Sequence, residues 1–200
     1  MPAPMHNVRK VPLKGMQAWR IPFLVAEDCA GLGAGFVSTQ RTVRRLERKI
    51  KLQPDRVRQF CCGPKFKFDV RCKYLSESND QLRAFLHSKH KQLGTKIVSD
   101  SAAGTADAGD KLLGLDGLVD LYMAGPNCQP FSKMGKNHGR ADERSETFRD
   151  AINFILKRKP KTFILEQVPN IKCKTHRSFL KHIIDKLRSL TSVPKTGHRR

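Results

Sequence analysis

The sequence has 200 residues, 38% of them hydrophobic and 28% charged, with a formal net charge of +21. This is the length of one ordinary globular domain. Its apolar runs fall far short of the ~20 residues of a membrane helix, its first ten residues lack the apolar stretch of a secretory signal, and its six cysteines form no Cys-x-x-Cys zinc pair.

The positive charge is unevenly distributed along the chain. Residues 37–74 hold twelve Lys or Arg against three acidic residues, and residues 157–200 hold thirteen against two. Such segregation favours a surface that faces a polyanion, with nucleic acid as the partner. The alternative is a basic face that is merely solvated.

Strand-like and helix-like segments alternate along the chain. The predicted strands are residues 21–26, 70–76, 95–99, 118–124 and 162–165. The predicted helices are residues 34–52, 80–89 and 145–157, and a last one marked by apolar residues at helical spacing from Phe179 to Leu187. Residues 53–68 are expected to form a basic insertion, residues 1–20 and 191–200 basic tails, and residues 21–190 a single core.

This alternation predicts an α/β fold, a Rossmann-like parallel sheet with helices on both faces. Ligands of such sheets bind beyond the carboxyl ends of the strands. The residues expected there are 28–35, Glu77, Asp100, 125–132 and 166–168.

A glycine-rich turn, Gly31-Leu32-Gly33-Ala34-Gly35, follows the first predicted strand. A strand, a glycine turn and a helix allow bare backbone to approach a ligand closely, which suits a dinucleotide or S-adenosylmethionine. An acidic partner is expected at the end of the second strand, where Glu77 stands. It lies further along the chain than the ~20 residues usual for dinucleotide sites, because the basic insertion intervenes.

A cysteine between proline and glutamine, in Gly125-Pro126-Asn127-Cys128-Gln129, follows the fourth predicted strand. Leu165-Glu166-Gln167-Val168 follows at the fifth. Adjacent strand-end loops would bring an attacking thiolate, Cys128, close to a carboxyl group, Glu166. The other cysteines are expected to be inert thiols, and His138 and His176 to be surface residues.

At this point the sequence resembles the cytosine-5 DNA methyltransferase family. Residues 23–35 resemble its glycine-rich first motif, and Glu77 and Asp100 resemble the acidic residues that bind its cofactor. Residues 125–132 resemble the loop of its catalytic cysteine, residues 166–168 its Glu-Asn-Val motif, and Arg144 the arginine of the segment between these two. Asn127 stands where the family usually has proline, and it is expected to loosen the loop of the catalytic cysteine slightly. Gln167 stands where the family usually has asparagine, and it is expected to lengthen the side chain that braces this loop.

The resemblance implies methyl transfer from S-adenosylmethionine to carbon 5 of cytosine in DNA. Cys128 would add to carbon 6, Glu166 would hold or protonate the neighbouring ring nitrogen, and Arg144 would complete the catalytic set. The implied cofactor-binding residues are Ala30, Gly31, Leu32, Gly33, Glu77, Asp100 and Pro126.

The family's target-recognition region and last motifs find no counterpart in residues 169–200, so the fold is expected to be incomplete at its C-terminal edge. A second chain could supply the missing segments. An RNA cytosine-5 methyltransferase and a non-catalytic nucleic-acid-binding remnant remain alternative interpretations. The expected location is intracellular, and nuclear if the source is eukaryotic.

Overall fold

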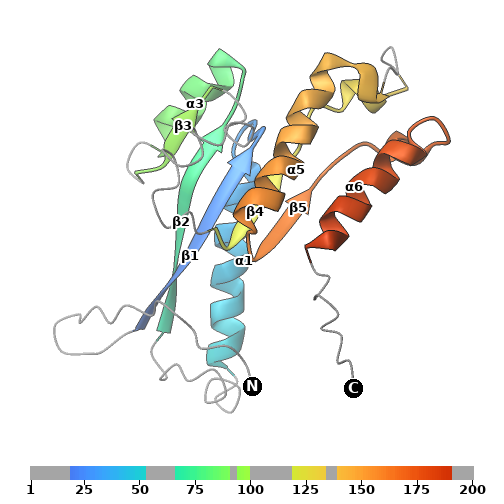
Figure 1. Cartoon of the computed structure of the whole chain (residues 1–200). Helices are drawn as coiled ribbons and strands as arrows, with labels where there is room; N and C mark the ends of the chain where they lie inside the picture. Colours follow the sequence, from blue (N-terminus) through green and yellow to red (C-terminus); the bar gives the residue numbers. More distant parts are fainter. Residues whose placement is uncertain (1–18, 53–65, 91–93, 100–118, 134–138, 191–200) are drawn as a thin grey trace, which may run out of the picture.

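The computed structural model describes residues 19–52, 66–90, 94–99, 119–133 and 139–190 (Figure 1). Its core is a parallel sheet of five strands in the order β3-β2-β1-β4-β5. The strands are β1 (Trp19–Asp28), β2 (Phe66–Ser76), β3 (Lys96–Val98), β4 (Leu121–Ala124) and β5 (Thr162–Leu165). The chain builds outward from β1 in one direction, then crosses to β4 and β5 on the other side. Ligands of such sheets bind beyond the carboxyl ends of the strands at this point of reversal, which here lies between β1 and β4.

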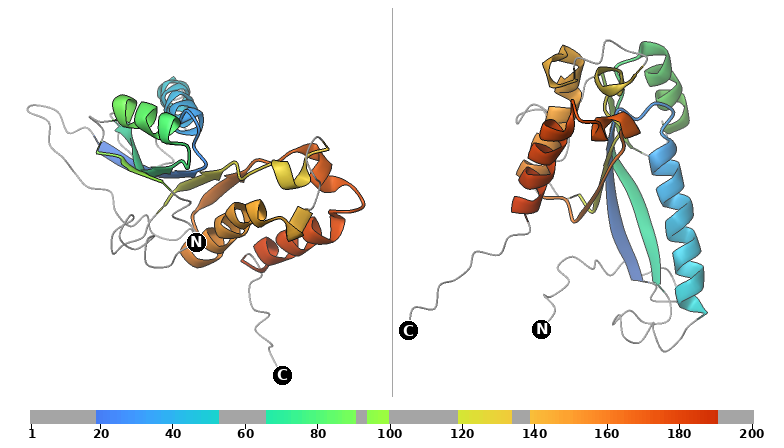
Figure 2. Two further views of the ribbon diagram at one scale, coloured as in Figure 1. Left: turned by 90° about the horizontal axis from the view of Figure 1, so that it is seen from above. Right: turned by 90° about the vertical axis from the view of Figure 1, so that its right-hand side faces the viewer.

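Four helices cover the two faces of the sheet. They are α1 (Ala34–Lys51), α3 (Asp80–His90), α5 (Glu146–Arg158) and α6 (Arg177–Ser189). Figure 2 shows α1 and α3 on one face of the sheet, with α5 and α6 on the other. The predicted α/β class, with a parallel sheet and helices on both faces, is confirmed.

Two buried apolar clusters hold α1, α3 and α5 on the sheet. On the side of α1 and α3, Val25 and Leu75 pack with Phe36 and Leu86. On the side of α5, Tyr74 and Tyr122 pack with Phe154, whose ring lies on Tyr122 at a centroid distance of 4.3 Å. Alternate residues of each strand point to opposite faces, so Val25 serves the first cluster and its neighbour Ala26 serves the second.

The strands β1 and β2 are longer than the sequence pattern indicated. β1 begins at Trp19 and runs through Asp28, and β2 begins at Phe66, inside the segment assigned to the basic insertion. Trp19 pairs with Phe66 and Ile21 with Phe68, and the carboxylate of Glu47 on α1 accepts the Phe68 N–H. Assigning residues 66–68 to a loop was therefore wrong, because pairing and a long-range hydrogen bond order them.

The strand β5 forms one end of the described sheet and carries exposed apolar side chains. Ile164 is 54% exposed. Within the described residues, no helix is long and apolar enough to cross a membrane.

Candidate active site

The carboxyl ends of the parallel strands β1, β2, β4 and β5 lie along one edge of the sheet (Figure 1). The glycine turn follows β1, Glu77 follows β2, the Cys128 loop (residues 125–132) follows β4, and Glu166 follows β5. The edge therefore collects most of the residues that the sequence analysis singled out. Asp100 lies outside the described residues.

The glycine turn is held in a left-handed backbone conformation at two positions. Gly31 has φ +53° and Gly33, which directly precedes α1, has φ +70°. A Cβ on Gly31 would meet no atom within 4 Å, so the backbone there faces open space. A Cβ on Gly33 would lie 3.1 Å from Leu86 and 3.3 Å from His90. Gly33 is thus required by strain and by packing, whereas Gly31 leaves room for a ligand.

Backbone hydrogen bonds tie the turn to the second strand. Ala30 donates its N–H to the Ser76 carbonyl at 2.8 Å, and Gly31 donates to the Glu77 carboxylate at 2.8 Å. Glu77 also accepts the Asn79 N–H at 2.8 Å. Two backbone donors fix the Glu77 carboxylate beside Gly31, and its remaining lone pairs are available to a ligand. Leu32, between the two glycines, is 60% exposed.

Two carboxylates at the end of β1 are buried beneath the turn. Glu27 accepts the Phe36 N–H at 2.9 Å in the first turn of α1. Burial raises the pKa of Glu27 to about 7, although the N–H groups of Phe36 and Gly35 partly offset this. A Cβ on Gly35 would lie 2.6 Å from the Glu27 carboxylate, which explains the third glycine of the turn.

Asp28 is 1% exposed and has three hydroxyl partners. Ser76 and Tyr122 donate to it at 2.6 Å, and Tyr74 lies at 3.4 Å. Burial raises the pKa of Asp28 to about 6, against the lowering effect of these hydrogen bonds. From the sequence, Asp28 was expected among the residues beyond the strand ends, and Glu27 had no predicted role. Two adjacent carboxylates after an apolar run could have signalled that both are held by partners.

Cys128 lies on the surface of its loop. It is exposed and immediately precedes the short helix η2 (Gln129–Phe131), where Phe131 donates to the Cys128 carbonyl at 3.0 Å. Pro126 and Pro130 on either side are buried. The thiol therefore projects from a loop whose flanks are fixed.

Glu166 is exposed and close to the base of the Cys128 loop. Its N–H donates to the Ala124 carbonyl at 3.0 Å, and its carboxylate oxygen lies 3.6 Å from the position of a Cβ on Gly125. The next side chain, Gln167, reaches the loop itself, with its amide nitrogen 3.4 Å from the carbonyl oxygens of Pro126 and Asn127. The structure thus brings the β4 and β5 loops together.

Arg144 belongs to η4 (Glu143–Ser145) and contacts the Cys128 loop through Gln129. Its guanidinium donates to the Gln129 side chain at 2.5 Å and forms a two-pronged pair with Asp142 at 2.8 and 2.6 Å. Hydrogen bonding to Asp142 raises the pKa of Arg144. Because Asp142 is buried, it fixes the direction of an arginine that is otherwise exposed.

An aromatic cluster anchors the far end of the Cys128 loop. Phe131 stacks on Phe179 of α6 at 5.5 Å and meets the His176 ring edge-on at 5.3 Å. Asn170 donates to the Phe131 carbonyl at 2.7 Å. The prediction that His176 is a surface residue was wrong, because it is 3% exposed and lies between Phe131 and Gly139. His138 lies outside the described residues.

Among the described residues, no group of three or more His, Cys, Asp and Glu side chains could hold a metal ion. At the ends of β1 and β2, carboxylates accept hydrogen bonds from hydroxyl and backbone N–H groups.

Comparison with solved structures defines the class of fold. The chain superposes on a DNA modification methyltransferase encoded within an E. coli prophage with a TM-score of 0.54 and 17% identity, over 84% of this chain and 38% of that one. The fold is thus that of a methyltransferase of this kind.

The sequence identifies the family. Residues 64–191 match the C-5 cytosine-specific DNA methylase family, and the chain belongs to it. Its relatives include the type II methyltransferase M.AluI of Cellulosimicrobium cellulans, 34% identical over 58% of this chain and 22% of the relative. M.NlaX of Neisseria lactamica is 33% identical over 52% of this chain and 30% of the relative. The chain therefore spans less than a third of the length of either.

Proposed function

We propose that this chain is the catalytic core of an enzyme that methylates carbon 5 of cytosine in DNA, with S-adenosylmethionine as the methyl donor. One observation carries the proposal. Exposed Cys128 and exposed Glu166 occupy neighbouring strand-end loops, and Gln167 spans the two. Relatives named as type II methyltransferases, M.AluI among them, support the reaction class.

Cys128 acts as the nucleophile, because carbon 5 of cytosine is too weakly nucleophilic to take a methyl group directly. Its thiolate forms a bond to carbon 6 while the Glu166 carboxyl donates a proton to ring nitrogen 3, which is conjugated with carbon 6 through carbons 4 and 5. The added electron pair makes carbon 5 the attacking atom. After methyl transfer, carbon 5 loses its proton to solvent water and the carbon–sulfur bond breaks, which returns the thiolate. Nitrogen 3 gives its proton back to Glu166.

Residues at the end of β1 and β2 fit the methyl donor. Open space beside Gly31 allows close approach to the backbone, and the fixed Glu77 carboxylate suits the two hydroxyls of a ribose. The other residues proposed to bind it are Ala30, Leu32, Gly33, Asp100 and Pro126. Bound there, S-adenosylmethionine supplies an electrophilic methyl group on sulfur.

The residues described above perform the chemistry and do not select the DNA sequence that is methylated. The chain corresponds to 22% of M.AluI, and residues of a longer protein or of a second chain would supply the recognition of sequence. In a eukaryotic cell, action on DNA would place the protein in the nucleus or in a DNA-containing organelle. A fluorescent fusion would locate it.

A mechanism-based trap tests the proposal. With S-adenosylmethionine present, DNA containing 5-fluorocytosine should form an adduct with the protein that survives denaturation, since fluorine cannot leave carbon 5 as a proton does. Cys128→Ser should abolish the adduct. Cys173→Ser is the matched control, because Cys173 is also a free thiol but follows η5 (Pro169–Lys172) rather than β4.

An adduct that persists undiminished in Cys128→Ser would refute the assignment of the nucleophile. An adduct with 5-fluorocytosine RNA alone would move the substrate from DNA to RNA. Nucleic-acid binding with no adduct on either substrate would favour the non-catalytic interpretation.

A further inference from the structure

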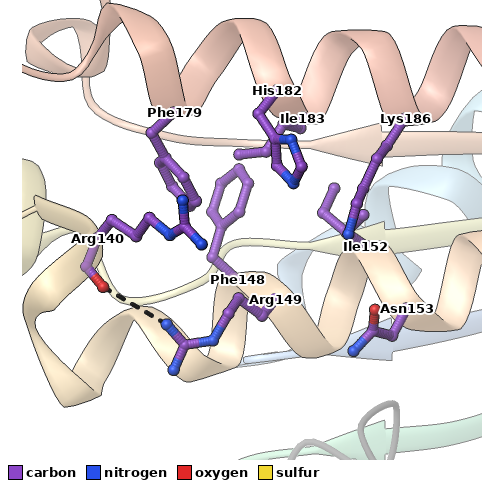
Figure 3. Close-up of a pocket in the computed structure, with 9 residues that line it drawn as sticks. All are labelled: Arg140, Phe148, Arg149, Ile152, Asn153, Phe179, His182, Ile183 and Lys186. Carbon is purple, nitrogen blue, oxygen red and sulfur yellow. Dashed lines mark hydrogen bonds between the residues drawn. The ribbon is translucent and has the colours of Figure 1, made fainter.

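The outer groove between α5 and α6 contains a hollow with a cationic rim and an apolar floor. Its volume is about 210 Å3, and Figure 3 shows the side chains that line it. Phe148 and Ile152 of α5 and Phe179 and Ile183 of α6 form the floor. On each helix the two floor residues are four positions apart and so lie on one side of the helix.

The rim carries three formal positive charges and a histidine. These side chains are Arg140, Arg149, His182 and Lys186, and all four are exposed. Figure 3 shows Arg140, His182 and Lys186 directed into the space between the helices. The Arg149 guanidinium donates to the backbone carbonyl of Arg140 at 3.5 Å. This contact with an uncharged group leaves the positive charges of both side chains in place. Within the described part of the chain, no Asp or Glu lines the hollow.

The positive charge of the rim indicates which kind of molecule the hollow would bind. A second copy of the same chain would bring more positive charge, and an uncharged ligand would leave the rim unneutralised. Guanidinium groups bind phosphate and carboxylate oxygens in a two-pronged geometry. The occupant is therefore anionic.

The groove is long and leads toward the candidate active site. A second hollow of about 320 Å3 shares Arg140, Phe179 and His182 with the first and extends to Thr175. From Arg177 to Lys186, α6 rises about 13.5 Å, over which one strand of a DNA duplex carries roughly four phosphates. At the Arg140 end, η3 (Gly139–Ala141) packs against η2, which is part of the Cys128 loop.

We infer that this α5–α6 groove binds the phosphate backbone of a nucleic acid, as a contact surface additional to the site around Cys128. The inference rests on the proposed function only in taking DNA as the polyanion. Continuity with the Cys128 loop favours a DNA strand over an acidic protein segment. Backbone contacts of this kind position a duplex without reading its sequence.

Binding to a DNA duplex labelled with fluorescein at one 5′ end, measured over a range of salt concentrations, tests the inference. Arg149→Gln/Lys186→Gln removes two rim charges outside the Cys128 loop. The slope of log affinity against log salt should fall by about 1.8, from ~0.9 per lost contact. If the variant and the unaltered chain bind DNA equally well at 1 M salt, this change of slope makes the variant bind roughly 60-fold more weakly at 0.1 M salt.

The matched control is Lys89→Gln/Lys96→Gln. These exposed lysines lie on α3 and β3, at the end of the sheet opposite β5 and outside both basic segments of the chain, and their loss lowers the net charge equally. Equal effects of the two double variants would overturn the inference, since only net charge would matter. No change in the groove variant would also overturn it. Lys186→Glu, a reversal at one exposed side chain, should weaken binding further and needs little structural adjustment.

Poly-L-glutamate separates phosphate from carboxylate recognition. If its binding depends on Arg149 and Lys186 as strongly as DNA binding does, the groove is a carboxylate site and the inference is wrong. The 5-fluorocytosine adduct reports on the proposed function separately. If the adduct forms but the groove variant has an unaltered salt slope, only the inference about the groove is refuted. If the salt slope changes as expected but no adduct forms, only the proposed catalysis is refuted.

Discussion

The side-chain amide of Gln167 lies 3.4 Å from the carbonyl oxygens of both Pro126 and Asn127. It thereby bridges the loop after β5 to the loop that carries Cys128. Both distances are long for a hydrogen bond, so the brace holds the loop weakly.

Removing this brace should slow the reaction of Cys128 more than it destabilises the fold. Gln167→Ala loses two weak hydrogen bonds, together worth about 1 kcal/mol. We expect the rate of adduct formation with 5-fluorocytosine DNA to fall about fivefold, with the melting temperature nearly unchanged. An equal rate in the variant would mean that other contacts, such as that of Asn170 with Phe131, suffice to position the loop.

Glu77 should control binding of S-adenosylmethionine. Glu77→Ala removes the carboxylate that accepts from Gly31 and Asn79, so it frees two N–H groups and removes a ribose acceptor. We expect at least a tenfold loss of affinity in titration calorimetry, from a charged hydrogen bond of about 1.5–3 kcal/mol. Asp185→Ala, at an exposed carboxylate of α6, is the control. Similar affinities in the two variants would place the donor elsewhere.

Glu27 should make the stability of the fold fall as the pH rises. Its pKa is raised from 4.5 to about 7 in the folded state, so the folded state retains a proton that the unfolded state releases. The protonated carboxyl therefore contributes fully below pH 4.5, and this contribution is lost up to about pH 7. The difference is about 3 kcal/mol, from 1.36 kcal/mol per pKa unit.

Urea unfolding of Glu27→Gln beside the unaltered chain measures this contribution. Glutamine cannot ionise, so the stability of the variant relative to the unaltered chain should improve between pH 4.5 and pH 8. Asp28→Asn should show the same sign over a lower range, because the pKa of Asp28 is about 6. A stability difference for Glu27→Gln that is independent of pH would contradict the burial argument.

Gly139 should tolerate no side chain, because His176 occupies the space. Its φ is +55°, and a Cβ would lie 2.5 Å from the His176 ring nitrogen. Gly139→Ala should cost about 1–2 kcal/mol for backbone strain and about 1–3 kcal/mol more for overpacking. Thermal unfolding measures the loss, and displacement of His176 from Phe131 should also slow adduct formation.

Gly94 provides the matched control for Gly139. It too has a positive φ, +64°, but a Cβ there would meet nothing within 4 Å. Gly94→Ala should therefore show the strain alone. If the two alanine variants lose equal stability, the contact between Gly139 and His176 carries no energetic weight.

The sequence by itself determined the α/β class, the placing of β4 and β5 before the Cys128 loop and Glu166, and the family. These follow from local patterns: apolar periodicity, a glycine-rich turn, and short motifs after strands. The strand predicted over residues 118–124 was recognised from its apolar residues and from Gly125-Pro126 after it, and the structure gives β4 as Leu121–Ala124. β5 was predicted with the observed bounds for the same reason.

Only the tertiary structure decided which side chains support those motifs. The start of β2 at Phe66 depends on pairing with Trp19, which lies 47 positions earlier in the chain. Burial of Asp28 depends on hydroxyls from Ser76 and Tyr122. His176 is buried because Phe131 and Gly139 close around it. Contacts between residues far apart in sequence leave no periodic trace, so no local pattern identifies which residues are the partners.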